Sequence, residues 1–410
     1  MNYKIVKIAS FYYNFLDYYY EKNQEIKKKS YKEQYNDIMN EGFGWANFYQ
    51  IHLNELGNEA YEIIYNADSL QRAWAQKMGI NKSGDELLIE QLKYLKPDVV
   101  FFQDSMHFSP KWIEEIKYIV PSIKLTIGWC CSPFTQEHLK LFSKFDIMLG
   151  CSPLFVDIFK KNNIKSYELN HAFESNLLSK LEKNNNYPNS DVIFIGSFRW
   201  GKDFHIDRLN LIEKLIRNNF DLKLYANIAQ DKYIKSFLTK AGYLYVNSMV
   251  KTGLSKMVYS NDKLKKLANL TEVPKRMKFS KEFLASLDNT KLFGLEMMKA
   301  ITKSKIGLNI HGGVAGTYAA NIRLFEVTGV GACLVTDWKQ NIKKFFIPDE
   351  EILTYKNIEE CNEKVKYLLS HPEKRKMIAE AGHRRTLSEH TFEKRARQLD
   401  EIIKDNFNCL

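Results

Sequence analysis

The sequence lacks the long apolar runs that would place the chain across a membrane. No stretch approaches about 18 uninterrupted apolar residues, so we predict no membrane-spanning helix. The opening residues, MNYKIVKIASFYYNF, also lack the continuous apolar core and the small-residue cleavage site of a secretory signal. We therefore expect a cytoplasmic protein.

Cysteine is sparse, and its spacing carries no metal or disulfide signature. None of the six cysteines belongs to a CxxC pair, and no histidine follows at zinc-binding spacing. Adjacent Cys130 and Cys131 could not easily bridge each other. We expect reduced thiols throughout and no structural metal; the six residues are Cys130, Cys131, Cys151, Cys333, Cys361 and Cys409.

Two further motifs are missing. No GxGxxG motif follows the first apolar run, Ile5–Ala9, where Ser10 and three aromatic residues stand instead, and this disfavours a dehydrogenase. No DxD motif stands at the end of a predicted strand, so we expect no metal bound there.

Positive charge is in excess, with 60 basic against 49 acidic residues and a formal net charge of +11. Such a balance suits a nucleotide diphosphate, an acidic membrane face or nucleic acid. Short lysine clusters (27–29, 263–266 and 374–376) are either solvated helix faces or a weak contact with the inner membrane surface. No nucleic-acid-binding motif is present and most aromatic residues fall at apolar periodic positions, so we expect no nucleic-acid partner.

Alternating strand and helix patterns run through both halves of the chain. Short apolar runs bounded by turns predict buried parallel strands, and amphipathic segments between them predict crossover helices. The predicted strands are Ile5–Ala9, Tyr61–Tyr65, Val99–Phe102, Leu125–Ile127, Ile147–Leu149 and Tyr167–Leu169, then Val192–Gly196, Leu222–Tyr225, Ile306–Ile310 and Cys333–Thr336. The predicted helices are Gly84–Lys96, Pro110–Ile119, Leu154–Lys161, Asn357–Leu369, Pro372–Ser388 and Thr391–Lys404.

The pattern stops at Asn184–Ser190, a linker rich in Asn, Pro and Ser. We therefore predict an α/β protein with one Rossmann-like domain over residues 1–183, a second over 190–390 and a final helical segment over 391–410. A Lys-rich stretch over about 241–286 predicts an insertion of helices and loops. With two facing parallel sheets, the shared cleft is the expected ligand site.

The segment from Lys305 to Trp338 holds the densest set of candidate ligand groups. It predicts a strand, then a loop with Gly312 and Gly313, then a helix from about Tyr318 whose positive end would face an anion. His311 stands at the end of the predicted strand, where it could touch a bound phosphate or the group that the phosphate carries. Three polar residues follow in the first turns: Asn321, Arg323 and Glu326. An arginine for phosphate and a carboxylate for a ribose diol form a plausible nucleotide pair, although an ordinary turn with a surface ion pair remains the alternative.

At this point the sequence resembles a known family. Asn321-Ile-Arg323-Leu-Phe-Glu326, followed by Gly329-Val-Gly331 and Leu334-Val-Thr-Asp337, is similar to the C-terminal signature of glycosyltransferases related to spore maturation protein CgeB, within the GT-B class. The resemblance implies that Glu326 binds the donor ribose and that Arg323 contacts phosphate. It also implies that Gly196, Ser197 and Arg199 lie beside the diphosphate, and that the last helix crosses back onto the N-terminal domain.

The same resemblance implies a nucleotide-diphosphate sugar as donor and a bacterial glycan, glycolipid or glycoprotein as acceptor, with no bound metal. Many retaining members carry a second Glu eight positions before the first, but here that position is Tyr318. The stereochemical outcome therefore stays open. The alternatives are another nucleotide-sugar enzyme on this fold, such as an epimerase, or a basic nucleic-acid-binding protein.

A general base should lie at the end of a strand in the N-terminal half. Three residues meet that rule: Asp104, His107 and His171. Each has a structural alternative: Asp104 as a helix cap, His107 as a solvated loop residue and His171 as a partner of backbone groups at the hinge. The aromatic opening over 11–20 is either a stacking surface for a sugar or the buried face of a helix.

Overall fold

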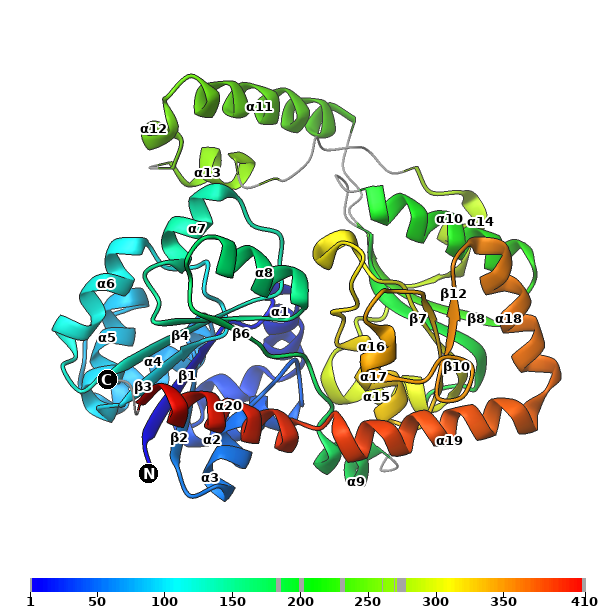
Figure 1. Cartoon of the computed structure of the whole chain (residues 1–410), viewed down its shortest axis with the longest axis horizontal. Coiled ribbons are helices and arrows are strands. Elements are labelled where there is room, and N and C mark those ends of the chain that lie inside the picture. The colour runs from blue at the N-terminus through cyan, green and yellow to red at the C-terminus, as the bar shows by residue number, and fades with distance from the viewer. Residues whose placement is uncertain are drawn as a thin grey trace.

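Two parallel β-sheets, each of six strands, form the two halves of the molecule (Figure 1). The structure is a computed structural model, and it describes residues 2–181, 186–198, 203–228, 233–259, 261–268, 270 and 278–407. This architecture confirms the predicted α/β class with two Rossmann-like sheets. No helix within these described ranges is long and apolar enough to cross a membrane.

The N-terminal sheet has the strand order β2-β1-β3-β4-β5-β6, with every pairing parallel. Its strands are β1 Lys4–Ala9, β2 Glu59–Ile64, β3 Val99–Phe102, β4 Leu125–Cys130, β5 Ile147–Gly150 and β6 Ser166–Glu168. All four side chains of β3 are buried, because helices cover both faces of the sheet. After β1 the chain adds β2 on one side of the sheet, and it then adds β3 on the other side of β1. The carboxyl ends of β1 and β3 are therefore the switch point of the sheet.

The helices of this half are short, and side chains cap the N-termini of some of them. Ser30, for example, forms a capping box with Glu33, and Ser109 accepts a hydrogen bond from Trp112 N at 3.1 Å. They are α1 Tyr13–Lys22, α2 Tyr31–Asn40, α3 Phe48–Glu55, α4 Asp68–Met78, α5 Gly84–Leu95, α6 Pro110–Ile119, α7 Gln136–Phe142, α8 Pro153–Lys161 and α9 Leu178–Leu181.

The C-terminal sheet has the order β12-β11-β10-β7-β8-β9, again with parallel pairings. Its strands are β7 Ser190–Phe198, β8 Leu222–Ile228, β9 Leu287–Asp288, β10 Ser304–Asn309, β11 Cys333–Asp337 and β12 Leu353–Tyr355. Its helices are α10 Asp203–Arg217, α14 Lys281–Ser286, α15 Gly294–Thr302, α16 Arg323–Gly329, α17 Ile342–Phe345, α18 Ile358–Ser370 and α19 Pro372–Glu389. Here the switch point lies between β7 and β10.

The last two helices connect the halves. Helix α19 runs along the C-terminal domain, and α20 (Phe392–Phe407) lies on the N-terminal domain (Figure 1). Asp400 of α20 accepts hydrogen bonds from Tyr3 OH at 2.8 Å and from Asn58 Nδ2 at 2.9 Å. The helix therefore crosses back between domains, as the resemblance implied.

The insertion over about 241–286 is helical in its described part, as predicted. Helices α11 (Tyr233–Lys251), α12 (Ser255–Tyr259) and α13 (Asp262–Ala268) form an arm that leaves the C-terminal domain and reaches over α7 (Figure 1). The arm has a small core of its own, made by Val246, Met249, Val258 and Ala268.

The expectation of six reduced cysteines is wrong for two of them. Cys131 and Cys151 form a disulfide, with Cα atoms 5.3 Å apart. They follow the neighbouring strands β4 and β5, whose register pairs Cys130 with Gly150, so the next residue on each strand stands side by side. Cys130, Cys333 and Cys361 are free and buried, and Cys409 lies outside the described residues.

Two strands at the edges of the C-terminal sheet, β9 and β12, were not predicted. Each has at most three residues, too few for an apolar run to stand out from its surroundings.

Candidate active site

At the switch point of the C-terminal sheet, one arginine joins the ends of the two central strands. Arg208 of α10 donates from Nη1 to the carbonyl of Ser197 at 2.9 Å and from Nη2 to the carbonyl of Ile310 at 2.8 Å. The side chain is largely buried, and burial lowers its pKa to about 10. Arg208 thus puts a fixed positive charge where this fold class binds its ligands.

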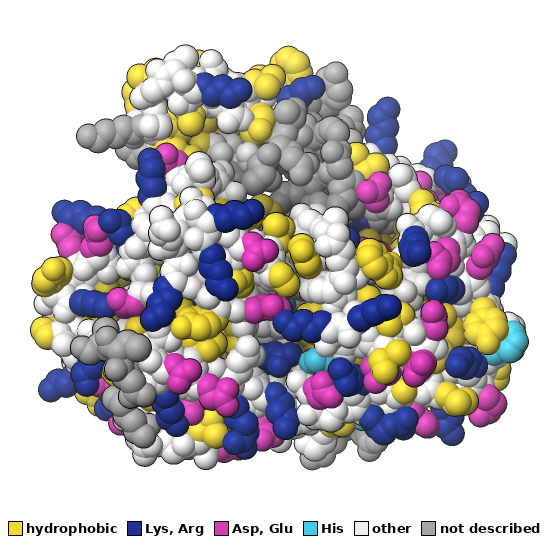
Figure 2. Space-filling view, viewed as in Figure 1, with side chains coloured by type: hydrophobic (Ala, Val, Ile, Leu, Met, Phe, Trp, Pro, Cys, Tyr) yellow, Lys and Arg dark blue, Asp and Glu magenta, His cyan; other side chains and the backbone are white. Residues whose placement is uncertain are grey.

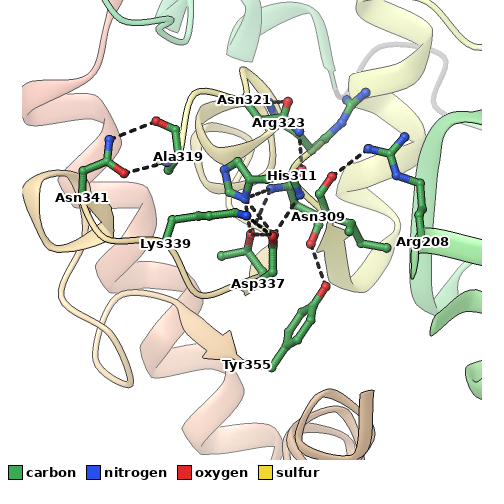
Figure 3. Close-up of polar contacts among 12 residues, drawn as sticks. Arg208, Asn309, His311, Ala319, Asn321, Arg323, Asp337, Lys339, Asn341 and Tyr355 are labelled. Carbon is green, nitrogen blue, oxygen red and sulfur yellow. Dashed lines mark hydrogen bonds and ion pairs between the residues drawn. The ribbon is translucent and has the colours of Figure 1, made fainter. Parts of the chain in front are cut away.

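Beside it, the ends of β10 and β11 form a polar network (Figure 3). Asp337 Oδ1 accepts a hydrogen bond from the backbone N–H of His311 at 2.8 Å and lies 2.7 Å from His311 Nδ1. Asn309 donates to Thr336 Oγ1 at 2.9 Å and accepts from Asn321 Nδ2 at 2.8 Å. The sequence-predicted residues His311 and Asn321 are therefore brought together, through Asn309.

The network holds a carboxylate in its charged form. Burial alone would raise the pKa of Asp337, but the nearby His311 and Lys339 outweigh it and hold that pKa at about 2. Lys339 Nζ lies 3.2 Å from Asp337 Oδ2. Because Nδ1 of His311 faces this carboxylate, Nδ1 carries the ring proton. The other ring nitrogen, Nε2, is buried without a hydrogen-bond partner among the described residues.

The glycine loop differs from the expectation at its end. The predicted helix from about Tyr318 is wrong, since α16 begins only at Arg323 and has seven residues. Gly312 precedes a short 3₁₀ turn over Gly313–Ala315, and the chain then stays irregular. Asn341 fixes this stretch by accepting from Ala319 N at 2.6 Å and donating to Ala319 O at 3.0 Å. The loop is therefore shaped by side-chain contacts rather than by a helix.

Arg323 and Glu326 share a face of α16, as their spacing predicts. Arg323 Nη1 lies 2.8 Å from Glu326 Oε2, in an ion pair that lacks the alignment of a hydrogen bond. Glu326 is 5% exposed. Burial raises its pKa and the charge of Arg323 opposes that rise. A second contact of Arg323 Nη1 is Met297 Sδ, at 2.8 Å.

The other donor-side candidates lie at the end of β7. A Cβ on Gly196 would approach the ring of Phe194 to 2.8 Å, so only glycine fits there without movement. Ser197 contributes its carbonyl to Arg208, as described above. Arg199 lies outside the described residues.

At the switch point of the N-terminal sheet, Asp104 follows β3 and Ser10 follows β1. Asp104 Oδ2 accepts from Ser10 Oγ at 2.8 Å and from Tyr65 OH at 3.1 Å. His107 is exposed; its ring is tilted against that of Tyr65, with centroids 4.4 Å apart, and its Nε2 lies 3.6 Å from Asp85 Oδ1. Asp104 and His107 thus share Tyr65, but only Asp104 is held by hydrogen bonds.

His171 lies in an aromatic cluster with Trp45 and Trp129. Its Nδ1 accepts a hydrogen bond from Trp45 Nε1 at 2.9 Å, and the ring centroid of Trp129 lies 5.1 Å away. Burial lowers its pKa to about 3, with a further contribution from Arg395. His171 is therefore a neutral ring whose Nε2 carries the proton, so it can donate a hydrogen bond but has no free lone pair to accept a proton.

The opening aromatic run divides between the two interpretations. Phe15 and Tyr19 are buried on one face of α1, whereas Tyr12 and Tyr13 are 70% and 71% exposed at its start. Helix α1 begins at the end of β1, beside Ser10. The exposed pair therefore lies at the same sheet edge as Asp104.

The glycine loop connects the carboxyl edges of the two sheets. Cys131 Sγ of the disulfide lies 3.6 Å from the carbonyl of Ala320. Gly316 has a φ of +58°, which favours glycine, and a Cβ there would be in van der Waals contact with Leu154 of α8 at 3.4 Å. Loop 311–322 is thus in contact with the carboxyl ends of β4 and β5.

Sequence reasoning assigned no role to four residues of this network: Arg208, Asn309, Asp337 and Lys339. Asn309 and Asp337 were detectable in principle, because Asn309 is near the end of the predicted strand Ile306–Ile310 and Asp337 directly follows Cys333–Thr336. Arg208 carried no such signal, since it lies within a helix and reaches the strand ends only through folding. Across the described ranges, no group of three or more His, Cys, Asp or Glu side chains could hold a metal ion.

Comparisons with known proteins agree with this geometry. Residues 273–401 match the model of a family described as glycosyl transferase-like. No curated protein sequence matches the chain.

Solved structures match over nearly the whole length. A glycosyltransferase from Rickettsia africae is 12% identical with a TM-score of 0.54, covering 98% of each chain. An α-glucosyltransferase in complex with UDP-glucose and DNA is 12% identical with a TM-score of 0.57, covering 98% of this chain and 100% of the other. The Anabaena protein HepE in complex with UDP and glucose is 11% identical with a TM-score of 0.53, with coverage of 98% and 100%. This chain has the GT-B fold.

Proposed function

We propose that this chain is a glycosyltransferase that moves a sugar from a nucleotide-diphosphate sugar to an acceptor hydroxyl. The observation that carries the proposal is the Arg323–Glu326 pair beside the His311–Asp337 network, at the switch point of a GT-B domain. The family match over residues 273–401 covers the same residues, and HepE was solved with UDP and glucose. The CgeB-like subfamily remains part of the proposal.

In this proposal the C-terminal domain binds the donor. Glu326 accepts hydrogen bonds from the ribose diol, which would relieve the cost of its buried charge. Arg323 and Arg208 place positive charge near the diphosphate, and His311 offers its buried Nε2 to the donor. Gly196, Ser197, Arg199, Gly312, Gly313 and Asn321 complete the proposed donor site. Positive charge at this position stabilises the departing nucleotide diphosphate without a metal.

Asp104 is the proposed general base. Ser10 and Tyr65 both donate to its Oδ2, which orients the carboxylate and leaves Oδ1 for the acceptor hydroxyl. His171 is unsuited to that role because Nδ1 is occupied by Trp45 and Nε2 carries a proton; it donates a hydrogen bond to a bound substrate instead. His107 is the second candidate for the base, since it is exposed and its neighbours are Asp85 and the rings of Tyr65 and Phe108.

The acceptor is proposed to be a bacterial glycan, glycolipid or glycoprotein, modified at the cytoplasmic face during polysaccharide biosynthesis. Exposed Tyr12 and Tyr13 offer aromatic faces on which a sugar ring could stack, at the same edge as Asp104. This placement favours a carbohydrate acceptor. A hexosyl group is the sugar that we propose is transferred.

The test is a thermal-shift screen with UDP, GDP, dTDP, CMP, ADP and NAD, followed by assays with the sugar conjugates of the nucleotide that binds. Stabilisation by one nucleoside diphosphate, with release of that nucleotide when acceptor is added, is the expected result. Conversion of the sugar nucleotide to an epimer without nucleotide release would assign an epimerase instead. Stabilisation by NAD alone, or by oligonucleotides alone, would overturn the proposal.

A further inference from the structure

The arm formed by α11–α13 carries an outward apolar surface that the transferase site does not use. Six of the sixteen large hydrophobic side chains exposed in the described part of the chain lie between residues 237 and 257. They are Phe237, Leu238, Leu244, Tyr245, Leu254 and Met257. Figure 2 shows apolar side chains gathered on this upper lobe together with lysines.

Helix α11 has two distinct faces. Tyr243, Val246 and Met249 are buried, and the latter two belong to the arm's own core. Positions 237, 241, 244 and 248, with 238 and 245 beside them, follow helical spacing on the opposite side and are exposed. We call Phe237, Leu238, Leu244 and Tyr245 the apolar face of α11.

Lysines border this apolar face. Lys240 and Lys251 are exposed and lie on one flank of it, since both fall within about 60° of Phe237 on a helical wheel. Over the whole arm, residues 233–268, the sequence has seven lysines and a single acidic residue, Asp262. An apolar helix face with a cationic flank is typical of helices that lie in the interface of an anionic bilayer.

The arm is also held in place over the N-terminal domain. Tyr259 of α12 is in hydrogen-bond contact with Thr135, just before α7. The face that carries Val246 and Met249 is covered by α12 and α13 through the core of the arm. The arm therefore presents the apolar face of α11 away from its own core.

We propose that the apolar face of α11 docks on the surface of an anionic lipid bilayer, with Lys240 and Lys251 at the headgroups. The excess of positive charge favours this occupant over a second copy of the chain, because two copies would bring like-charged arms together. Docking does not depend on the transferase chemistry, and it would hold the cleft at the membrane face where lipid-linked acceptors are found.

The experiment is co-sedimentation of the full chain with vesicles of phosphatidylcholine alone and of phosphatidylcholine mixed with phosphatidylglycerol. Wild type should bind only the mixed vesicles. The variant Phe237→Ser/Leu244→Ser should bind them roughly tenfold more weakly, through lost apolar burial. Lys240→Gln/Lys251→Gln should weaken binding to a similar extent and reduce its sensitivity to salt.

A matched control removes two exposed apolar side chains elsewhere, Tyr118→Ser on α6 and Met377→Ser on α19, which are 85% and 62% exposed. The control should bind vesicles like wild type, and all variants should keep the wild-type response to nucleotide, which separates this proposal from that of donor binding. Equal vesicle binding by wild type and the Phe237→Ser/Leu244→Ser variant would overturn the proposal. So would a dimer, seen by sedimentation equilibrium without lipid, that this variant dissociates.

Discussion

Arg323 Nη1 lies 2.8 Å from Glu326 Oε2 one helical turn away, and both side chains are largely buried. A buried pair of this kind contributes little net stability, yet breaking it by removing one partner is costly because a lone charge remains. Both residues belong to α16 of the C-terminal domain, at the proposed ribose site. Arg323 therefore pairs with the carboxylate of Glu326 in the ligand-free protein.

Replacing Arg323 with alanine should destabilise the protein by about 3–5 kcal/mol, because it leaves Glu326 unpaired. The raised pKa of Glu326 gives this loss a pH dependence. A carboxyl whose pKa is raised on folding binds its proton more tightly in the folded state, so stability falls as pH rises above the ordinary pKa. Urea unfolding should show a larger loss at about pH 8 than at about pH 5.

The control for that experiment is Glu326→Gln/Arg323→Ala, which removes the carboxylate as well. Its stability should vary with pH less than that of Arg323→Ala. An equal pH dependence of the two variants would show that Glu326 is not the group responsible.

The second prediction concerns how the stability of the protein depends on Asp337, which is surrounded by hydrogen bonds and charges. Its pKa is lowered from 3.8 to about 2, so the carboxylate stabilises the fold at neutral pH and this contribution is lost as pH falls from about 4 towards 2. Asp337→Asn should cost about 2 kcal/mol at neutral pH and much less near pH 2. Thermal unfolding across this range measures the effect, and Asp349→Asn, at a 68% exposed side chain, is the control.

Much of this fold follows from short-range sequence patterns. Four fully buried residues in a row, as in β3, predict a strand covered on both faces, and the strand bounds were predicted there without error. The order of the strands in each sheet does not follow in the same way, because it depends on crossovers between distant segments. The domain bounds, with the linker at 184–190, stay a prediction.

The candidate site was only partly predictable for the same reason. The Cys131–Cys151 disulfide requires the register of β4 and β5, which no local spacing reveals. The late start of α16 results from a contact with a distant residue, Asn341. Its side chain bonds both polar backbone atoms of Ala319, and this holds the chain out of a helical conformation. Tertiary contacts override local propensity in both cases.

Asp104 supplies the third prediction. Asp104→Asn should lower kcat by about 10²–10⁴-fold, because the amide cannot take the acceptor proton. Affinity for the nucleotide should stay unchanged, because the donor site lies on the other domain. Tyr65→Phe, which removes one donor to Oδ2, should have a smaller effect on kcat. Wild-type turnover by Asp104→Asn would remove Asp104 from the reaction and leave His107 as the candidate to test.

The fourth prediction concerns a buried ion pair away from the cleft. Lys7 of β1 contacts Glu62 of β2, and both side chains are at most 3% exposed. Burial lowers the pKa of Lys7 and raises that of Glu62, and the attraction between the two opposes both shifts. Oε2 of Glu62 has no hydrogen-bond partner among the described residues. The contacts of the pair therefore do not fully offset the cost of burying its charges.

Lys7→Met should therefore cost about 3–5 kcal/mol, whereas Lys7→Met/Glu62→Met should be close to wild type in stability. The single variant should lose stability further as pH rises, because Glu62 must then ionise without its partner. The double variant has no such group, so its stability should be less sensitive to pH. Denaturant unfolding of the two variants at several pH values decides the point: a double variant as unstable as the single one would mean that the pair itself, rather than its uncompensated charge, stabilises the N-terminal sheet.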